Sequence, residues 1–525
     1  MNGRCCGGMT LLTVAALASC AVGPNYHAPD VAVPGHYAAV PAKPAGATTA
    51  PAPSAAPPID LAGWWHALGD PELDSLVDRA IKANPDLEIA LDRLQAARTY
   101  ESAALGIALP SAQASAGAGR GTGSDLTRSR VSPILGSGEN GAGVEQVNVL
   151  AGFDAVWELD VFGKFRREIE AARDDTSAAA YARNAVLVSV IADVARAYVD
   201  LRGLQVRAAV LAAAIDVLRE SLRIVNIRYE RGITNELDVT LAQRELGVLQ
   251  AQLAPLEAQI SAAQYTLATL LGRYPEELVA ELAQKAMVPA VPAGVAPGLP
   301  LELLRRRPDV QQAERELAGA TARIGVAAAD LFPRLAVTAS VGAQQQGFGR
   351  VPVIGQHIWA AGPAALWPLL DFGQLDAQVQ IADLQARALL VSYKKTIQGA
   401  VSEVDSALDA YAAQQDSLMR LSDALMASQR ALTLANERYE RGLTDFLNVV
   451  DAERQEYEIE QEYTLAQVVV AEQFVALYRA LGGGWQSYQA LPPIRRPLPA
   501  VVALFREVLS RGDPLKEPPG PAAAP

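Results

Sequence analysis

Five short motifs occur twice in this chain in the same order, and this repetition constrains the fold more than any other feature. Two of the motifs recur 223 residues later: Asn84-Pro85-Asp86 as Arg307-Pro308-Asp309, and Leu109-Pro110 as Phe332-Pro333. The other three recur about 210 residues later: Leu159-Asp160-Val161-Phe162-Gly163 as Leu370-Asp371-Phe372-Gly373, RYERGIT from Arg228 as RYERGLT from Arg438, and Leu270-Leu271-Gly272 as Ala480-Leu481-Gly482. The pattern predicts a duplicated unit of about two hundred residues. The offset falls by 13 in one interval only, where one copy has a longer loop.

Each copy is predicted to contain a helix, a strand hairpin, a long helix, a turn and a second long helix. No proline interrupts residues 163–254 or 369–491. Apolar residues in the first of these stretches alternate steps of four and three, the seam of a coiled coil, at Leu187, Ile191, Val194, Tyr198 and Leu201. A helix from Gly163 to near Tyr229 would be about 100 Å long. Pro255 is expected to kink or break the next helix.

The segments between helices alternate apolar and polar residues, the period of a strand. One parity of the first hairpin is apolar, at Val147, Val149, Ala151, Phe153, Ala155, Trp157 and Leu159. A membrane β-strand and a half-buried soluble strand both give this pattern. Trp157, Trp359 and Trp367 are expected in interfacial girdles if the strands span a membrane. Two hairpins give four strands with two open edges, which lipid does not tolerate, so such a chain must associate; three copies would supply twelve strands.

The N-terminus has the pattern of a bacterial lipoprotein signal. Arg4 precedes a short apolar run at residues 9–17, and Leu17-Ala18-Ser19-Cys20 resembles a cleavage box whose cysteine becomes lipidated. The alternative is an ordinary signal peptide with a chance cysteine. Residues 28–58 are rich in Pro and Ala and are expected to form an extended linker. No later stretch has eighteen consecutive apolar residues, so no membrane-spanning helix is predicted.

Several function classes are disfavoured. The net charge of −13 argues against binding nucleic acid. The four histidines are scattered, and all three cysteines, Cys5, Cys6 and Cys20, lie near the N-terminus, so neither a metal site nor a disulfide framework is expected. Residues 136–141 fit GxGxxG, but they lie in a hairpin loop with no strand before them and no helix after them. We therefore expect no enzymatic activity and no cofactor apart from the covalent lipid on Cys20.

The repeated motifs, with Cys20-Ala21-Val22-Gly23-Pro24-Asn25-Tyr26 and Arg307-Pro308-Asp309-Val310, resemble those of the outer membrane efflux protein (TolC-like) family, in its lipoprotein branch. The resemblance covers residue 17 to about residue 482. It implies a mainly α chain with a membrane β-barrel portion: a homotrimer whose twelve-stranded outer-membrane β-barrel continues into a long periplasmic α-helical barrel. Ala21, which follows the lipidated cysteine, implies sorting to the outer membrane.

The resemblance also implies a function. Such channels passively conduct substrates that an inner-membrane RND-type transporter expels through a periplasmic adaptor protein, in contact with outer-membrane lipid. A structural outer-membrane lipoprotein without a pore is the alternative. The implied organisation is a signal peptide at 1–19, an anchor and linker at 20–60, a first repeat at 61–300, a second repeat at 301–485 and a Pro-rich tail at 486–525. Hairpins are expected at about 110–160 and 333–371, and tip turns at about 229–236 and 439–446.

The two RYERG turns are the candidate docking sites for the adaptor. Gly232 and Gly442 suit a tight turn, and Thr234 and Thr444 are expected to cap the helices that follow. Two ordinary helix–turn–helix connections would explain Gly and Thr, but they explain less well why Arg231 and Arg441 both recur. The resemblance implies that adaptors contact such tips.

The pore gate is expected just beyond the second turn, at Leu447, Asn448, Asp451 and Arg454. By resemblance, Asp451 matches a constriction Asp and Leu447 an apolar ring, whereas Asn448 stands where relatives outside the lipoprotein branch carry a second Asp. Three copies of Asp451 near one axis would attract cations and disfavour anions. The alternative is an exposed Asp that pairs with a Lys or Arg. Asp238 lies at the analogous place in the first copy and is expected to pair across the tip.

Overall fold

The computed structural model describes residues 21–39, 60–122, 145–284, 286–292, 306–348, 351–352 and 356–488. Cys20, the loop at 136–141 and residues 489–525 of the tail therefore lie outside the described residues. The chain divides into two compact units, Met1–Ser487 and Tyr488–Pro525. The first unit contains the duplicated helices and the strands.

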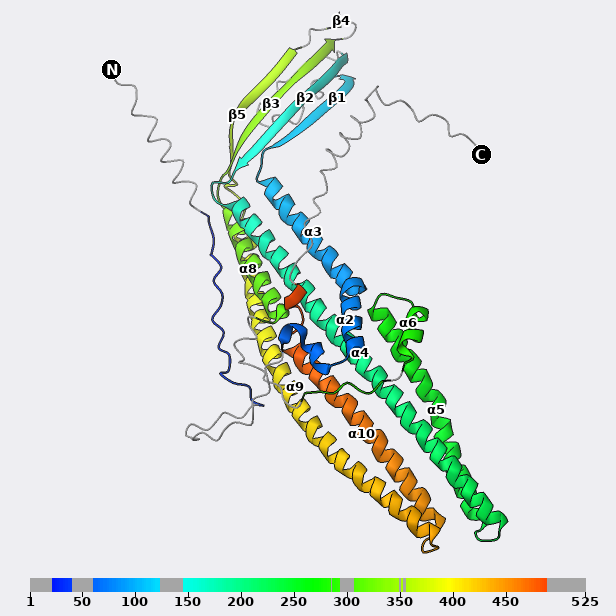
Figure 1. The fold of residues 1–525 in the computed structure, drawn as a ribbon. Coiled ribbons are helices and arrows are strands. Elements are labelled where there is room, and N and C mark those ends of the chain that lie inside the picture. The colour runs from blue at the N-terminus through cyan, green and yellow to red at the C-terminus, as the bar shows by residue number, and fades with distance from the viewer. Residues whose placement is uncertain are drawn as a thin grey trace, which may run out of the picture. The chain divides into compact units, whose positions relative to one another are not determined.

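The helices occur as two matching sets (Figure 1). The first set is α3 (Pro85–Ile107), α4 (Lys164–Glu230) and α5 (Glu236–Leu270), and the second is α8 (Pro308–Ala329), α9 (Gln374–Glu440) and α10 (Phe446–Ala480). Helices α4 and α9 both have 67 residues, and α5 and α10 both have 35. The predicted long helices are therefore confirmed, and the duplication extends to equal helix lengths.

Short elements flank these helices at mid-length. They are η1 (Leu61–Leu68), α2 (Pro71–Ala83), α6 (Pro275–Leu282) and η3 (Gln486–Tyr488). Buried aromatic rings join η1 to α10: Trp64 stacks on Tyr478 at 5.6 Å between ring centroids and meets Phe474 edge-on at 6.1 Å. Tyr198 of α4 donates a hydrogen bond of 2.6 Å to Asp70 before α2. A large part of the core therefore lies midway along the long helices.

Helix α5 runs through Pro255 without a break, so of the two expected effects, a kink or a break, the break does not occur. Pro255 itself is exposed, and its neighbour Leu256 packs with Leu249 and with Leu211 and Leu218 of α4. A proline inside a helix costs about 3 kcal/mol through a lost hydrogen bond and a clash. The packing of the adjoining leucines on α4 offsets that cost.

The strands form one antiparallel sheet, with the element bounds β1 (Ser111–Thr122), β2 (Glu145–Leu159), β3 (Arg334–Phe348), β4 (Val351–Pro352) and β5 (Gln356–Leu366). Strand β2 pairs with β1 and β3, and β3 pairs with β5 and with the two-residue β4. Ser111 lies opposite Val156, and Arg334 lies opposite Leu366, so the two hairpins share one register. Among the described residues, β1 pairs only with β2 and β5 only with β3, which leaves two outer edges.

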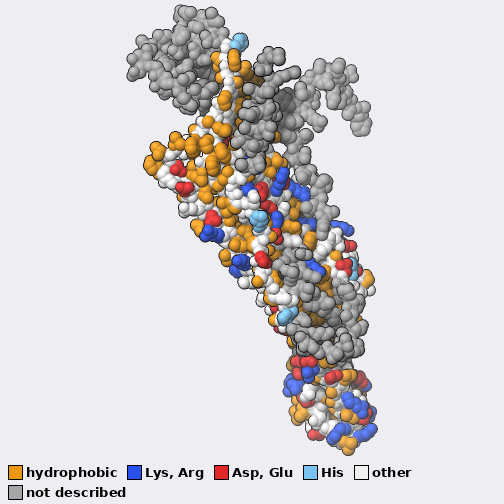
Figure 2. Space-filling view, turned by 90° about the vertical axis from the view of Figure 1, so that its left-hand side faces the viewer, with side chains coloured by type: hydrophobic (Ala, Val, Ile, Leu, Met, Phe, Trp, Pro, Cys, Tyr) orange, Lys and Arg blue, Asp and Glu red, His pale blue; other side chains and the backbone are white. Residues whose placement is uncertain are grey.

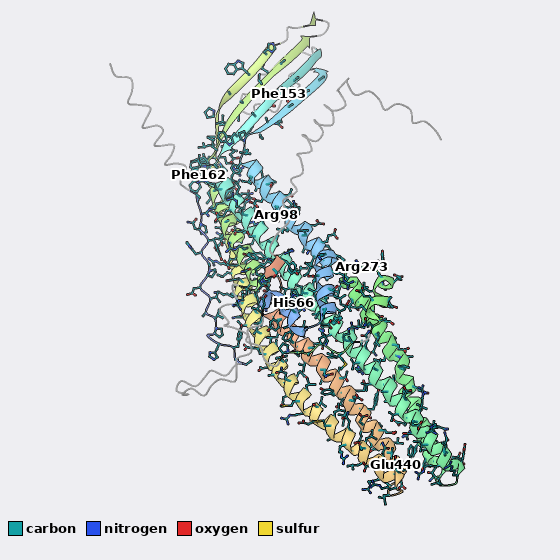
Figure 3. The ribbon with its side chains drawn as sticks, viewed as in Figure 1. His66, Arg98, Phe153, Phe162, Arg273 and Glu440 are labelled. Atoms are coloured by element: carbon teal, nitrogen blue, oxygen red, sulfur yellow. The ribbon has the colours of Figure 1, made fainter. Side chains whose placement is uncertain are left out.

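The strands meet the helices at a junction that is also duplicated. Trp157 donates its indole N–H to the Ala108 carbonyl oxygen at 3.2 Å, and Trp367 donates to the Leu331 carbonyl oxygen at 3.1 Å. Phe162 stacks on Phe332 with ring centroids 4.7 Å apart, and Figure 3 shows Phe162 where the strands end. Each hairpin is thereby tied to the C-terminal end of the helix that precedes a strand. All three tryptophans expected in girdles, Trp359 included, are exposed in the single chain.

The N-terminal segment at 21–39, which includes the start of the expected extended linker, contains no helix or strand and is packed against the helices. The Val22 amide donates to the Phe162 carbonyl oxygen at 3.1 Å. Arg167, only 4% exposed, donates to the carbonyl oxygens of Val22 and Gly23. Further along, the ring of Tyr37 is buried among α9 and α10. In the described part of the chain, no helix is both long enough and apolar enough to cross a membrane.

Candidate functional site

The two tip turns share one backbone geometry. In the first, the Gly232 amide donates to the Tyr229 carbonyl oxygen at 2.9 Å, and the Ile233 amide donates to the Arg228 carbonyl oxygen at 2.8 Å. The second turn repeats these bonds at 3.0 and 2.9 Å. Both glycines have positive φ, +68° at Gly232 and +71° at Gly442. This pattern closes the C-terminal end of a helix and favours glycine because a Cβ strains that backbone.

The expected capping role of Thr234 and Thr444 is wrong. Helix α5 begins one residue later, and Asn235 is the cap: its side chain accepts from the Asp238 amide at 3.2 Å. Thr234 donates instead to the Asp238 carboxylate. In the second turn, Thr444 accepts from the Asn448 side chain at 2.8 Å. Asp238 therefore pairs within its own turn rather than across the tip. Each threonine forms a side-chain hydrogen bond with the residue four positions later.

The outer surface of the tips combines two arginines with apolar side chains. Arg231 and Arg441 are exposed, and Arg441 lies 4.0 Å from Glu437. Exposed apolar side chains surround them, at Ile233, Leu237, Leu443 and Leu447. We call these six residues the tip surface. Figure 3 marks Glu440 at this end, and Figure 2 shows charged side chains gathered there. The sequence analysis missed Ile233, Leu237 and Leu443, although an apolar residue follows the glycine in both copies.

Beneath the tip surface, an apolar cluster joins the two hairpins. Phe446, Val449 and Val450 of α10 pack against Val225 of α4 and against α5. The guanidinium of Arg228 lies 4.5 Å from the centre of the Tyr439 ring, a cation–π contact between the two RYERG copies. The Tyr439 ring also contacts Phe446, with centroids 5.4 Å apart. The first and second motifs are therefore in direct contact.

The gate candidates lie on the opposite side of α10 from this cluster. Leu447 is 56% exposed, and Asn448 is exposed as well. The Asp451 carboxylate pairs with Arg454 at 2.8 Å and accepts from Gln455 at 2.8 Å. The side chains of Asp451 and Arg454 are both 48% exposed. In the single chain Asp451 is thus an exposed carboxylate on the helix surface that pairs with an arginine. It lies on the same face of α10 as Leu447.

The sequence analysis missed a buried carboxylate near the gate candidates. Glu453 accepts from the Ser221 hydroxyl at 2.6 Å with one oxygen, and its other oxygen is buried without a hydrogen-bond partner. Burial raises the pKa of Glu453, although the Ser221 bond opposes the shift. A cavity of about 240 Å³ adjoins it and is lined in part by Glu245, Glu456 and Glu460. Glu453 is buried by contacts between helices that lie far apart in the sequence, so no local sequence pattern reveals it.

The sequence is similar to outer-membrane proteins of known families. The family model described as "Outer membrane efflux protein" matches residues 76–273 and 299–483. The antibiotic efflux pump outer membrane protein ArpC of Pseudomonas putida is 30% identical over 477 residues, which cover 90% of this chain and 94% of ArpC. Nodulation protein T of Rhizobium leguminosarum bv. trifolii is 29% identical over 474 residues, 89% of this chain and 95% of that protein.

A solved structure has a similar fold over most of this chain. The outer-membrane channel OprN superposes with a TM-score of 0.76 at 33% sequence identity, covering 89% of this chain and 100% of that one. The two regions that match the family model contain the two sets of long helices and both hairpin tips. The chain therefore belongs to the outer membrane efflux protein family.

Proposed function

We propose that three copies of this chain form the outer-membrane duct of a tripartite efflux pump. Substrates driven by an inner-membrane RND-type transporter would pass through a periplasmic adaptor and then through the duct. The duplicated helical hairpin, with a four-stranded sheet at one end and two matched tips at the other, carries the proposal. The duct itself does no catalysis and needs no cofactor, so the energy comes from the transporter.

Assembly into a trimer is supported by what the single chain leaves exposed. The outer edges of β1 and β5 present backbone groups that would be unsatisfied in lipid. Large apolar side chains are also exposed on α3 and at the start of α9. Figure 2 shows hydrophobic side chains gathered over the strands and their junction with the helices. Twelve strands from three copies would close the sheet into a barrel without edges.

A lipid anchor at Cys20 is supported by the residue that follows it. Gly163 lies at the β2–α4 junction, and a Cβ added to it would meet Ala21. Lipid on Cys20 would therefore enter the membrane at the level where strands give way to helices. The substitution Cys20→Ser is expected to abolish incorporation of labelled palmitate. Labelling that persists in this variant would contradict the anchor.

Docking of the adaptor is supported by the tip surface. Exposed leucine and isoleucine side chains offer apolar contact area, and the guanidinium groups of Arg231 and Arg441 lie beside it. The partner would be a helical tip of complementary shape with acidic residues at its edge. The substitutions Ile233→Asp and Leu443→Asp are expected to weaken capture of the adaptor, while the exposed Leu465→Asp, far along α10, is not.

A planar-bilayer measurement tests the function as a whole. The purified full-length protein is expected to migrate as a trimer and to produce discrete conductance steps. A scaffold lipoprotein without a pore would give no steps at any protein concentration. A monomer without conductance would overturn the proposal.

A further inference from the structure

Helices α4 and α10 belong to different copies of the repeat, yet they pack directly against each other (Figure 1). We call this contact the α4–α10 seam. A Cβ added to Gly203 of α4 would overlap Val468 of α10, so the two helices approach closely there. Arg207 donates to the Gln461 side chain at 3.0 Å, and Gln461 donates to the Arg207 carbonyl oxygen at 3.0 Å. The seam therefore combines close packing with polar bridges between the two hairpins.

A pair of carboxyl groups bridges the seam three residues before Gly203. Asp200 of α4 is hydrogen-bonded to Glu472 of α10. An ionised carboxylate only accepts hydrogen bonds, so this bond requires a proton on one of the two groups. Arg196 donates to the other side of Glu472 at 2.9 Å, and the Glu472 side chain is only 18% exposed. The arrangement favours an ionised Glu472 beside Arg196 and a proton on Asp200.

The shared proton stabilises the seam in acid. Burial raises the pKa of Asp200 to about 6, the charge and hydrogen bond of Glu472 add to the shift, and Arg196 opposes it. An aspartate that has left the seam titrates near its ordinary value of about 4. The stabilisation is therefore complete below that ordinary value and is lost as the pH rises through about 6. Above this pH, two like charges face each other across the seam and repel.

Arg196 is the cation that contacts the carboxyl pair. Arg196 and Glu472 border a groove of about 790 Å³. Within the described residues, the other charged groups that line this groove pair among themselves: Arg307 with Asp309 and Glu403, and Arg479 with Asp193 at 3.7 Å. The loop at 286–292 packs on the seam through valines and contains no charged residue. The proton affinity of the pair is therefore set mainly by burial and by Arg196.

The end of the seam nearer the tips contains a second carboxyl group that favours its proton. Glu453 of α10 accepts from Ser221 of α4 at 2.6 Å, and burial raises the pKa of Glu453. The charged groups that face it across the adjoining cavity are Glu245 of α5 and Arg454, Glu456 and Glu460 of α10. Protonation thus stabilises the seam at two levels, whereas the bridge between Arg207 and Gln461 does not titrate near neutral pH.

We propose that the α4–α10 seam is an acid-closed latch, in which Asp200 and Glu472 share a proton that holds the two helical hairpins together. As the pH rises, the pair loses this proton and the α9–α10 hairpin separates more readily from the α4–α5 hairpin. The latch adds a regulation to the proposed function and rests on it for its role in a duct. Its strength is a property of helix packing, which can be measured without conductance.

Hydrogen-exchange mass spectrometry of the full-length protein in detergent tests the latch at about pH 5 and about pH 7, on either side of the raised pKa of Asp200. The measured quantity is the protection factor of peptides across residues 196–204 and 468–476, which corrects for the intrinsic effect of pH on exchange. Protection in the parent protein is expected to be about tenfold higher at the lower pH, because one pKa unit corresponds to a tenfold change in the opening equilibrium.

Two amide variants remove the need for the proton. The asparagine in Asp200→Asn donates to Glu472 at any pH, so its protection is expected to match that of the acidified parent and to stay within about twofold between the two pH values. Glu472→Gln is the second variant, because its amide donates to Asp200, and it is expected to lose the pH response as well. Circular dichroism at both pH values checks that the helices of each variant remain formed.

Asp193→Asn is the matched control, because Asp193 lies on α4 beside the same groove but faces Arg479 instead of a carboxyl group. It is expected to keep the pH response of the parent. Arg196→Gln removes the cation that opposes the raised pKa, so the midpoint of the response is expected to move to higher pH. A side chain that acts only through packing would leave this midpoint unchanged.

The outcomes separate the latch from the duct. Equal protection of the parent at both pH values, or a pH response that both amide variants retain in full, would overturn the latch and leave the proposed duct intact. A parent protein that shows the expected response but gives no conductance steps in planar bilayers would overturn the duct and leave the latch as a property of the helices.

Discussion

At the scale of single residues, the tip turns depend on a left-handed glycine. Gly232 and Gly442 have open space around the position of a Cβ, so a larger side chain would meet no neighbour. Any cost of substitution therefore comes from the backbone alone. This makes the tips a clean place to separate conformational strain from packing.

The substitution Gly442→Ala is expected to destabilise the second tip by about 1 kcal/mol, because alanine in a left-handed conformation is strained. Hydrogen-exchange mass spectrometry of peptides across residues 436–450 is expected to show roughly fivefold faster exchange at this cost. Gly247→Ala is the control: Gly247 lies in α5 with open space and no positive φ, so alanine there is expected to slow exchange slightly. Equal behaviour of the two variants would contradict the strain argument.

Glu453 is expected to make the stability of the region near the gate candidates depend on pH. Burial raises the pKa of Glu453 above its ordinary value. Glu453 therefore binds its proton more tightly when α10 is packed on α4 than when the two helices separate. The packing of α10 on α4 is therefore least stable when Glu453 is ionised, and its stability increases as the pH falls through the raised pKa. Glu245, Arg454, Glu456 and Glu460 face the same cavity.

Glu453→Gln is accordingly expected to slow hydrogen exchange in the α4–α10 seam at pH 7, relative to the parent protein at the same pH. The advantage is expected to shrink as the pH falls through the raised pKa, where the parent carboxyl gains its proton. Glu440→Gln, at an exposed tip carboxylate, is expected to change neither. An advantage for Glu453→Gln that stays constant with pH would rule out ionisation as the cause.

Residues differed in how far the sequence could predict them. The turn glycines were predictable because their role is local, and so were Asp160 and Asp371, which mark the strand-to-helix junctions. The threonine caps failed because Asn235 and Asp445 take the cap position one residue later. Ile233, Leu237, Leu443 and Glu453 required the three-dimensional structure, which decides what is exposed and what is buried.

At the scale of elements, Arg307 fastens three helices at one point. Its guanidinium donates to the Ala480 carbonyl oxygen at the end of α10 at 2.8 Å. It also pairs with Asp309 of α8 at 2.6 Å and with Glu403 of α9 at 2.7 Å. Burial lowers the pKa of Arg307, but these two carboxylates outweigh it, so the pKa is raised overall. The Arg-Pro-Asp motif is therefore a structural clamp in the second copy.

Arg307→Ala is expected to cost about 1–3 kcal/mol, because the Ala480 carbonyl oxygen loses its buried partner. Glu403→Ala removes an ion pair whose carboxylate is 61% exposed and is expected to cost under about 1 kcal/mol. Thermal unfolding followed by circular dichroism, with both variants in the same detergent, measures the difference. Equal shifts would mean that the ion pair, rather than the carbonyl, carries the clamp.

Helix lengths and order were predictable from proline-free runs and repeated boundaries, since both are local signals. The break at Pro255 was not, because the packing of α5 on α4 overrides the local penalty. The two-residue β4 and the packing of residues 21–39 also depended on contacts between distant parts of the sequence. The helices and strands were thus predictable from the sequence, whereas the contacts between them were predictable only in part.

At the scale of the whole molecule, the internal duplication doubles the number of hairpins that each chain would contribute to an assembly. Each chain supplies two nearly equal halves, so three chains would place six hairpins around one axis. The halves differ at the tip: Arg228 lies over Tyr439 inside the chain, while the equivalent Arg438 and Tyr229 are exposed. Only the second half carries Asp451: Leu241 occupies the equivalent place in the first half, and Asp238, which was expected there, is equivalent to Asn448.

This asymmetry places the gate prediction on the second half. Asp451→Ala would remove three carboxylates from the narrow end of the assembled duct and free Arg454 from its partner. We expect higher conductance of the resting channel, a shift in ion preference away from cations, and greater entry of antibiotics into cells that express the variant. The preference would change because the remaining guanidinium groups attract anions.

Asp416→Ala is the matched control, because Asp416 forms a similar exposed pair with Arg420 on α9, at 2.9 Å, away from the tip. It is expected to leave conductance, selectivity and antibiotic entry at the parental level. Arg454→Ala separates charge from pairing: it breaks the same ion pair but keeps the three carboxylates, so its cation preference should rise rather than fall. If Asp451→Ala behaves like Asp416→Ala, Asp451 is an ordinary surface carboxylate and the constriction lies elsewhere on the tips.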